Sequence, residues 1–165
     1  MNNFKIDYLA NRPDCLHACA AWAYGRWGVQ KKDGSLDRAI SIFKKGMQKD
    51  KLPLTLIVTN LETDLPVAMG SLWESDGTEW PEKTPWIASI YTLYRYRGLG
   101  LAKNLIKRLE EEAQTIGFQE VYLQSGSAAN FYHNLGYKEI ETVKTKTTAA
   151  GTETLFIKKF TTKCE

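Results

Sequence analysis

Arg97-Gly98-Leu99-Gly100-Leu101-Ala102 links an apolar run, residues 86–93, to an amphipathic segment that ends at Gly117. The apolar run predicts a strand, and the spacing of leucines after the glycines predicts a helix over residues 100–116. The glycines of such a turn allow a ligand to approach the backbone closely, and the first amides of the helix point toward it. The arrangement is therefore typical of an anion-binding site.

The start of this predicted helix lacks the side chains that usually cap one. Ser, Thr, Asp or Asn is the common cap, and acidic residues are favoured in the first turn. Residues 98–102 supply neither, and the first charged side chain after them is the cation Lys103. The unpartnered amides and the positive charges of Arg97 and Lys103 favour a phosphate or pyrophosphate ligand over a plain turn with water on its amides.

Two familiar phosphate motifs do not fit this turn. A P-loop requires Gly-Lys-Ser/Thr after its spaced glycines, whereas this chain has Ala102-Lys103-Asn104. A dinucleotide fingerprint requires a third glycine where Lys103 stands, and an acid at the end of the next strand. Glu120 is at about the right distance but begins that strand. Both nucleotide motifs are therefore disfavoured.

The pattern that does fit is Gln/Arg-x-x-Gly-x-Gly/Ala, with Arg97, Gly100 and Ala102 at its fixed positions. It resembles the pyrophosphate-binding loop of the GNAT superfamily of acetyl-CoA-dependent N-acetyltransferases. Residues 128–137, Ala-Ala-Asn-Phe-Tyr-His-Asn-Leu-Gly-Tyr, also resemble the family's Ala-x-x-Phe-Tyr-x-x-Leu-Gly-Phe/Tyr segment. The resemblance covers about residues 85–160. It implies acetyl-CoA as the co-substrate.

The spacing of apolar residues predicts one α/β (α+β) domain over residues 1–165, with a mixed, mostly antiparallel sheet flanked by helices. A helical crossover joins the strands 86–93 and 120–124, so they should run parallel. The resemblance implies that this parallel pair splays apart to admit the cofactor. Glu110, Glu111 and Glu112 are expected on the solvated face of their helix. The other predicted strands are 4–9, 54–59, 66–73, 137–143 and 154–160, and the other helices begin at 13, 36 and 130.

The composition is that of an ordinary globular protein, with 43% hydrophobic and 25% charged residues. The net charge of +3 is mild and the lysines are dispersed, which argues against a nucleic-acid partner. No export signal and no apolar run of membrane-spanning length is present, so we expect a cytoplasmic protein with no membrane partner, as a monomer or homodimer. Cys15, Cys19 and Cys164 are expected to be reduced thiols. His17 is expected on a different helix face from Cys15 and Cys19, so no metal site is expected.

The resemblance also implies the residues that handle the acetyl group. Tyr132, the Tyr of the Phe-Tyr pair, is the candidate acid that protonates the departing thiolate, although its ring could simply pack against the sheet. The backbone of Tyr91, Thr92 and Leu93 is expected to bind the pantetheine arm and to polarise the acetyl carbonyl. Asn130 is expected to cap its helix, to bind the same arm, or both.

The general base is harder to assign, because the central strand has no carboxylate between residues 86 and 95. Glu74 and Asp76, at the end of the preceding strand, are the next candidates. Strand alternation would place them on one side, where a pair of acids can raise one pKa or attract a cationic amine. A solvated acidic loop is the other interpretation. Trp73, Trp80 and Trp86 could line an amine-binding cleft by cation–π contact or could be packing residues.

The resulting prediction is direct transfer of an acetyl group from acetyl-CoA to a primary amine, carried by a small molecule or a peptide. A non-catalytic acyl-CoA sensor with the same fold is the alternative, since the central strand lacks an acid. A nucleotide-binding regulator that uses the same turn is a third interpretation.

Overall fold

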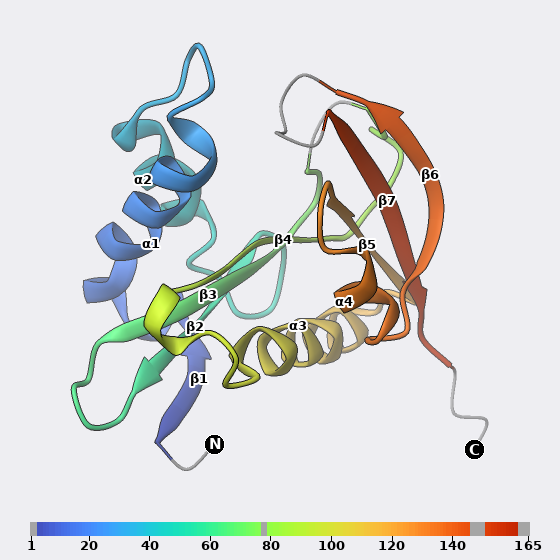
Figure 1. Cartoon of the computed structure of the whole chain (residues 1–165). Coiled ribbons are helices and arrows are strands. Elements are labelled where there is room, and N and C mark those ends of the chain that lie inside the picture. Colours follow the sequence, from blue (N-terminus) through green and yellow to red (C-terminus); the bar gives the residue numbers. More distant parts are fainter. Residues whose placement is uncertain (1–2, 77–78, 146–150, 162–165) are drawn as a thin grey trace.

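Within the described residues, 3–76, 79–145 and 151–161, the computed structural model contains one seven-stranded mixed sheet (Figure 1). The spatial order of the strands is β1-β2-β3-β4-β5-β7-β6. Each predicted strand is confirmed, with bounds that differ by at most two residues. The bounds are β1 Phe4–Tyr8, β2 Leu54–Asn60, β3 Pro66–Trp73, β4 Trp86–Thr92, β5 Glu120–Ser125, β6 Lys138–Lys144 and β7 Thr152–Lys159.

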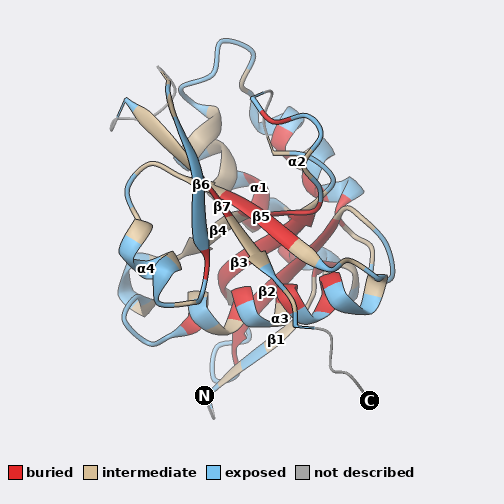
Figure 2. Ribbon diagram, turned by 90° about the vertical axis from the view of Figure 1, so that its right-hand side faces the viewer, coloured by how far each residue is buried: buried red, intermediate tan, exposed pale blue. Residues whose placement is uncertain are grey.

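Helices cover both faces of this sheet (Figure 1). Side chains alternate along β2, so that Leu56 and Val58 join the core under α3, while Ile57 joins the core under α1 and α2. Burial is therefore deepest in the central strands, and Figure 2 shows β6 almost wholly exposed. The helices are α1 Leu16–Ala23, α2 Leu36–Lys45, α3 Leu101–Ile116 and α4 Ala129–His133.

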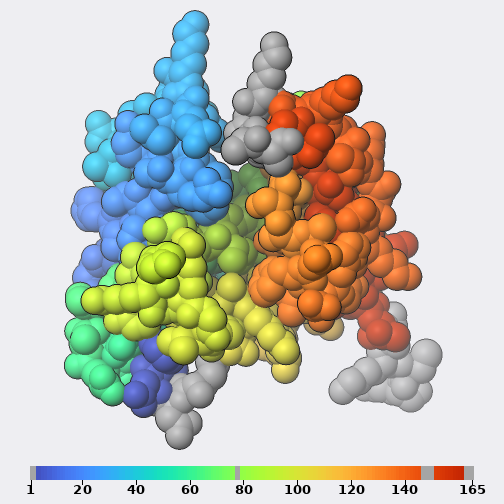
Figure 3. All heavy atoms as spheres, in the orientation of Figure 1, coloured from blue at the N-terminus to red at the C-terminus, as the bar shows by residue number. Residues whose placement is uncertain are grey.

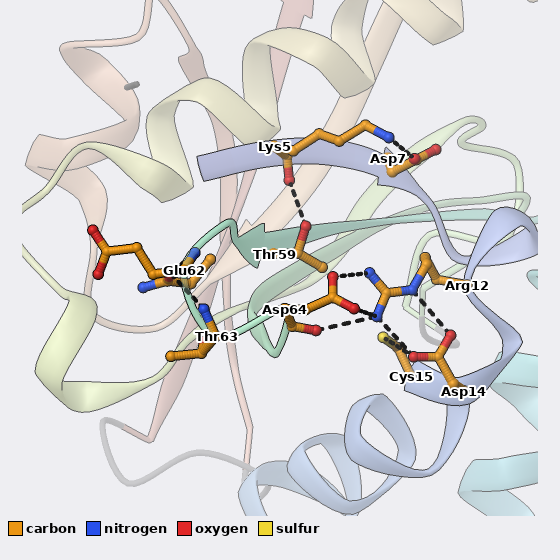
Figure 4. Close-up of polar contacts among 10 residues, drawn as sticks. Lys5, Asp7, Arg12, Asp14, Cys15, Thr59, Glu62, Thr63 and Asp64 are labelled. Atoms are coloured by element: carbon orange, nitrogen blue, oxygen red, sulfur yellow. Dashed lines mark hydrogen bonds and ion pairs between the residues drawn. The ribbon is translucent and has the colours of Figure 1, made fainter. Parts of the chain in front are cut away.

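The first helical region is less regular than expected. It begins with a 3-10 turn, Pro13–Cys15, continues as α1, and ends in a π-helical turn, Tyr24–Gly28. Arg12 anchors its start to the β2–β3 turn, because the guanidinium donates to Asp14 Oδ2 at 2.8 Å and to Asp64 Oδ1 at 2.9 Å (Figure 4). This double contact fixes the segment that leads into α1.

β4 and β5 run parallel and separate almost at once, as expected. Trp86 and Tyr122 are their one aligned pair, and the amide of Tyr122 donates to the carbonyl of Pro85 at 2.9 Å. Beyond this point the two strands continue for several residues without pairing. The facing backbone groups of β4 are consequently left available to a ligand.

The central strand carries a β-bulge that the sequence did not predict. Its register against β3 shifts between Met69 and Ser71, and Ser89 has a φ of 54°, a left-handed conformation that is uncommon for a non-glycine residue. Gly70 lies opposite, where an added Cβ would come within 2.6 Å of Ile90 Cδ1. Bulges and strained residues of this kind often lie next to functional sites.

The prediction that residues 110–112 form a solvated acidic face is wrong for two of them. Glu110 and Glu112 are only 7% and 5% exposed. Each accepts a tyrosine hydroxyl and a cationic side chain, Glu110 from Tyr137 and Glu112 from Tyr8. The run looked solvated because a helix pattern alone does not reveal partners on distant strands, and such partners make a buried carboxylate tolerable.

Candidate functional site

The glycine-rich turn leads into α3 with both glycines in left-handed conformations, Gly98 at φ 78° and Gly100 at φ 76°. Gly100 is the N-terminal cap and provides no side-chain acceptor. Its carbonyl accepts from the Asn104 amide at 3.1 Å, which is the first helical hydrogen bond. Among the described residues, the amides of residues 101–103 have no acceptor. This confirms the uncapped helix start that the sequence predicted.

The side chains around this turn leave it open and positive. Gly98, Leu99, Gly100 and Lys103 are exposed, whereas Leu101 is buried in the core under α3. Arg97 donates from Nε to the Thr92 carbonyl at 3.2 Å, which holds its guanidinium beside the end of β4. The turn therefore presents backbone amides and two cations to solvent, the combination that binds an anion.

At the end of β4, the backbone amides and carbonyls of successive residues point alternately toward β3 and toward β5. The Leu93 amide donates to the Val67 carbonyl of β3 at 2.9 Å, and the Leu93 carbonyl accepts from the Tyr96 amide at 2.9 Å. Because hydrogen bonding alternates along an antiparallel pair, Thr92 turns its amide and carbonyl away from β3, toward the side of β5. The Thr92 backbone thus faces the gap between the separated strands.

Tyr132 lies on α4, on the other side of that gap. Its ring packs against Phe131, Tyr137 and Phe156, with centroid distances of 5.2, 5.9 and 5.6 Å. No described residue forms a hydrogen bond with its hydroxyl. Desolvation by burial raises the pKa of Tyr132 to about 12, so the phenol is protonated at neutral pH.

Asn130 is exposed and borders an open cavity of about 410 Å³ at the end of β5. It does not cap α4, because the cap position belongs to Ala128, whose amide donates to Ser125 Oγ at 3.2 Å. The capping interpretation is therefore wrong, and the Asn130 side chain is available to a ligand. The cavity is lined by Ser125, Gly126, Ser127, Ala128, Ala129, Asn130, Phe131 and Thr154.

Glu74 and Asp76 do not share a strand face, because β3 ends at Trp73. Glu74 is exposed, whereas Asp76 is partly buried and its carbonyl accepts from Gln124 Nε2 at 2.6 Å. Desolvation by burial raises the pKa of Asp76 to about 6, against opposing effects of Gln124 and Lys31. A carboxyl with this pKa is ionised at neutral pH and can still accept a proton.

The aromatic residues near the acids are packing residues. Trp80 and Trp86 are 6% and 1% exposed, and they stack on each other at 6.2 Å. Trp80 Nε1 donates to Glu141 Oε2 at 2.9 Å, which ties the β3–β4 connection to β6. For Trp80 and Trp86 the structure favours packing, whereas Trp73 is only partly buried against the same cluster.

A different aromatic cluster, Trp22, Trp27 and Tyr91, lies on the α1 side of β4. Trp22 stacks on Tyr91 at 5.5 Å, and Trp27 meets Tyr91 edge-on at 6.4 Å. All three side chains are partly exposed. The only sequence signal for this cluster was three aromatic residues near the first helix, with no motif to link them to β4.

Figure 3 shows the molecule hollowed between the N-terminal helices, in blue, and the segments that follow β5, in orange, with the central strands at the floor. The structure therefore gathers the turn at α3, the end of β4, α4 and the aromatic cluster around the gap where β4 and β5 separate.

The Acetyltransferase (GNAT) family matches residues 16–137, which include both the glycine-rich turn and the Phe131-Tyr132 pair. This chain belongs to the GNAT family. The match spans well over half of the chain and agrees with the resemblance found in residues 85–160.

Solved structures share the GNAT fold with this chain. The Salmonella typhimurium protein yncA with its cofactor acetyl-CoA has a TM-score of 0.73 and 16% identity, over 97% of this chain and 95% of that one. An aminoglycoside 6'-N-acetyltransferase complexed with coenzyme A has a TM-score of 0.71 and 14% identity, over 98% and 99%. Arabidopsis thaliana Naa50 in complex with a bisubstrate analogue has a TM-score of 0.69 and 16% identity, over 96% and 99%. No curated protein sequence matches the chain.

The remaining chemistry of the described residues is limited. Cys15 and Cys19 are free and buried, and Cys164 lies outside the described residues. Across residues 3–76, 79–145 and 151–161, no group of three or more His, Cys, Asp or Glu side chains could hold a metal ion. No described helix has both the length and the apolar character needed to span a bilayer.

Proposed function

We propose that this GNAT protein is an N-acetyltransferase that moves an acetyl group from acetyl-CoA directly to a primary amine. The observation that carries the proposal is the open, uncapped start of α3 after two left-handed glycines, beside the gap between β4 and β5. Bound acetyl-CoA or coenzyme A in the solved structures of the same fold supports this assignment. A small-molecule or peptide amine is the acceptor.

In this proposal the turn holds the pyrophosphate. The amides of residues 98–103 donate to its oxygens, and Arg97 and Lys103 add positive charge. The backbone of β4 from Tyr91 to Leu93 aligns the pantetheine arm, with the Thr92 groups facing the gap, and Asn130 binds the same arm from α4. Leu99, Leu101 and Ala102 contribute through their backbone.

The chemical step needs a base for the amine, a donor for the carbonyl oxygen and an acid for the thiolate. Asp76 removes a proton from the ammonium form of the acceptor, directly or through water, and Glu74 adds negative charge near the entrance. The amine lone pair then forms the C–N bond as the C–S bond breaks. Tyr132 donates its proton to the departing sulfur, and the second proton of the attacking nitrogen leaves as the amide forms and restores the Tyr132 phenol through water. No covalent acyl-enzyme is formed.

The first test compares acetyl-CoA, CoA, ATP and NAD in thermal-shift measurements, followed by a screen of amines with acetyl-CoA. At a hundred times its dissociation constant, a ligand raises the melting temperature of a domain of this size by about 5 °C or more. We expect this shift with acetyl-CoA and CoA. Stabilisation by ATP or NAD but not by CoA would favour the nucleotide-binding interpretation.

The absence of an acid on β4 favours a second candidate, a non-catalytic acyl-CoA sensor. Its signature is binding of acetyl-CoA with no acetylation across a broad amine panel. Acetylation of any amine at a rate that depends on Asp76 contradicts the sensor. The cytoplasmic location and the monomeric or dimeric state stay predictions from the sequence.

A further inference from the structure

A buried ionic network lies beside Tyr132 and has no part in the chemistry proposed above. Glu110 of α3 accepts the Tyr137 hydroxyl at 2.8 Å and the Lys158 ammonium of β7 at 2.7 Å. The Lys158 nitrogen also lies 5.4 Å from the centre of the Tyr137 ring. Burial of a carboxylate is tolerable only when such partners are held in good geometry. The network therefore fixes the Tyr137 ring relative to α3.

The Tyr137 ring in turn forms one side of the Tyr132 site. The two rings meet edge-on at 5.9 Å, with an interplanar angle of 74°. The Tyr137 amide donates to the Tyr132 carbonyl at 3.1 Å, which joins the two residues through the backbone as well. Phe156 of β7 packs on the Tyr132 ring, with a centroid distance of 5.6 Å. Since the Tyr132 hydroxyl has no hydrogen-bond partner among the described residues, ring packing sets its direction.

We propose that Glu110 is a positioning residue for acetyl transfer, which holds Tyr132 in place through the hydroxyl and ring of Tyr137. The inference rests on the proposed function, in which Tyr132 protonates the thiolate. In this arrangement α3 acts at two places in the site, the pyrophosphate and the acid. Its first turn holds the pyrophosphate, and Glu110, ten residues from Gly100 and about 15 Å along the helix, sets the acid.

The same helix contains a matched network that supplies a control. Glu112 accepts the Tyr8 hydroxyl at 2.7 Å and is paired with Arg108. Tyr8 lies on β1, the strand at the far edge of the sheet from β7 and β6. Removal of the Tyr8 hydroxyl breaks the same kind of bond, between a tyrosine and a buried glutamate, without touching the packing around Tyr132.

The experiment compares steady-state kinetics of Tyr137→Phe, Tyr8→Phe, Tyr132→Phe and the double variant Tyr132→Phe/Tyr137→Phe, with an acceptor found in the amine screen. We expect Tyr132→Phe to lower kcat about 100-fold, the low end of the usual general-acid contribution. Tyr137→Phe should lower kcat about tenfold with KM for acetyl-CoA unchanged, because small misplacements of reacting groups are costly. Tyr8→Phe should leave both constants near the wild-type values.

The double variant separates positioning from a general structural effect. If Tyr137 acts through Tyr132, its substitution lowers kcat no further once the Tyr132 hydroxyl is gone. Glu110→Gln keeps an acceptor for the Tyr137 hydroxyl and should retain most of the rate, whereas Glu110→Leu should match Tyr137→Phe. If Tyr137→Phe does not fold, this glutamate pair gives the same comparison.

The outcomes distinguish the two proposals. A normal kcat for Tyr137→Phe, an equal loss in Tyr8→Phe, or additive losses in the double variant overturns the positioning role while acetyl transfer stands. An unchanged kcat for Tyr132→Phe overturns both Tyr132 as the acid and the positioning role. A wild-type protein that acetylates no amine overturns the proposed function, and the positioning role with it.

Discussion

Asp76 illustrates how position determines the chemistry of a single residue. It follows the end of β3 at Trp73, so its side chain is placed by a loop that reaches Gln124 on β5. Partial burial there raises its pKa to about 6, while Glu74, two residues earlier, is exposed. From residue type and spacing alone, the two carboxylates were equal candidates for the general base. Their different surroundings make Asp76 the stronger candidate for the base.

We predict that Asp76→Asn lowers kcat/KM by at least tenfold at neutral pH and removes the acidic limb of its pH profile. In the wild type that limb falls below about pH 6, since the base must be ionised. A raised carboxyl pKa also makes the folded state lose stability as pH rises from about 4 to 6, so the variant should be less sensitive to pH in that window. Glu82→Gln, at an exposed carboxylate, is the control. A wild-type pH profile in Asp76→Asn would exclude this base.

At the scale of elements, α3 combines an open end with a tightly bound body. Its first amides have no acceptor among the described residues, although its apolar side is buried against the sheet. Glu110 ties its second half to Lys158 of β7, and Glu112 ties it to Tyr8 of β1, near the opposite end of the sheet. The helix is therefore held rigidly while its start is free to bind an anion.

We predict that Gly100→Asp raises the dissociation constant for CoA at least tenfold, by bulk and by repulsion of the pyrophosphate. Gly100→Asn has nearly the same shape and no charge, and it tolerates the left-handed conformation equally well. The affinity of this control should fall much less. Isothermal titration of both variants measures the difference, and near-normal CoA affinity in Gly100→Asp would place the pyrophosphate elsewhere.

At the scale of the whole molecule, the cleft exists because the sheet separates at its centre. β4 and β5 share one aligned pair, and Figure 3 shows the N-terminal helices and the segments that follow β5 on opposite sides of the hollow. Trp22 and Trp27 come from the N-terminal third of the chain, and Tyr91 comes from the central strand. This cluster lies on the sheet face opposite α3, and we propose that the acceptor binds beside it.

We predict that Trp22→Ala raises KM for the acceptor amine about tenfold, because it removes the ring that stacks on Tyr91. KM for acetyl-CoA should change less than twofold, since the pyrophosphate turn lies on a different element. Val29→Ala, at an exposed side chain close in sequence, serves as the control. Equal increases in both KM values for Trp22→Ala would mean that this side chain supports the fold rather than the acceptor.

Local patterns alone were enough to predict the strands, the helix after Gly100 and the parallel pair, because periodicity and glycine placement act over short distances. They also predicted the uncapped start of α3. They did not predict the bulge at Ser89, the burial of Glu110 and Glu112, or the cluster of Trp22 with Tyr91. Each of these depends on a partner from a distant segment.

The sequence by itself therefore determined the family-defining turn, the order of elements and the class of ligand that the turn can bind. Only the tertiary structure decided which acids are desolvated, which tryptophans pack on Tyr91 and where the Thr92 backbone points. The physical reason is that capping and helix dipoles are local properties of the chain. Burial, pKa and side-chain contacts instead arise from the packing of segments that lie far apart in sequence.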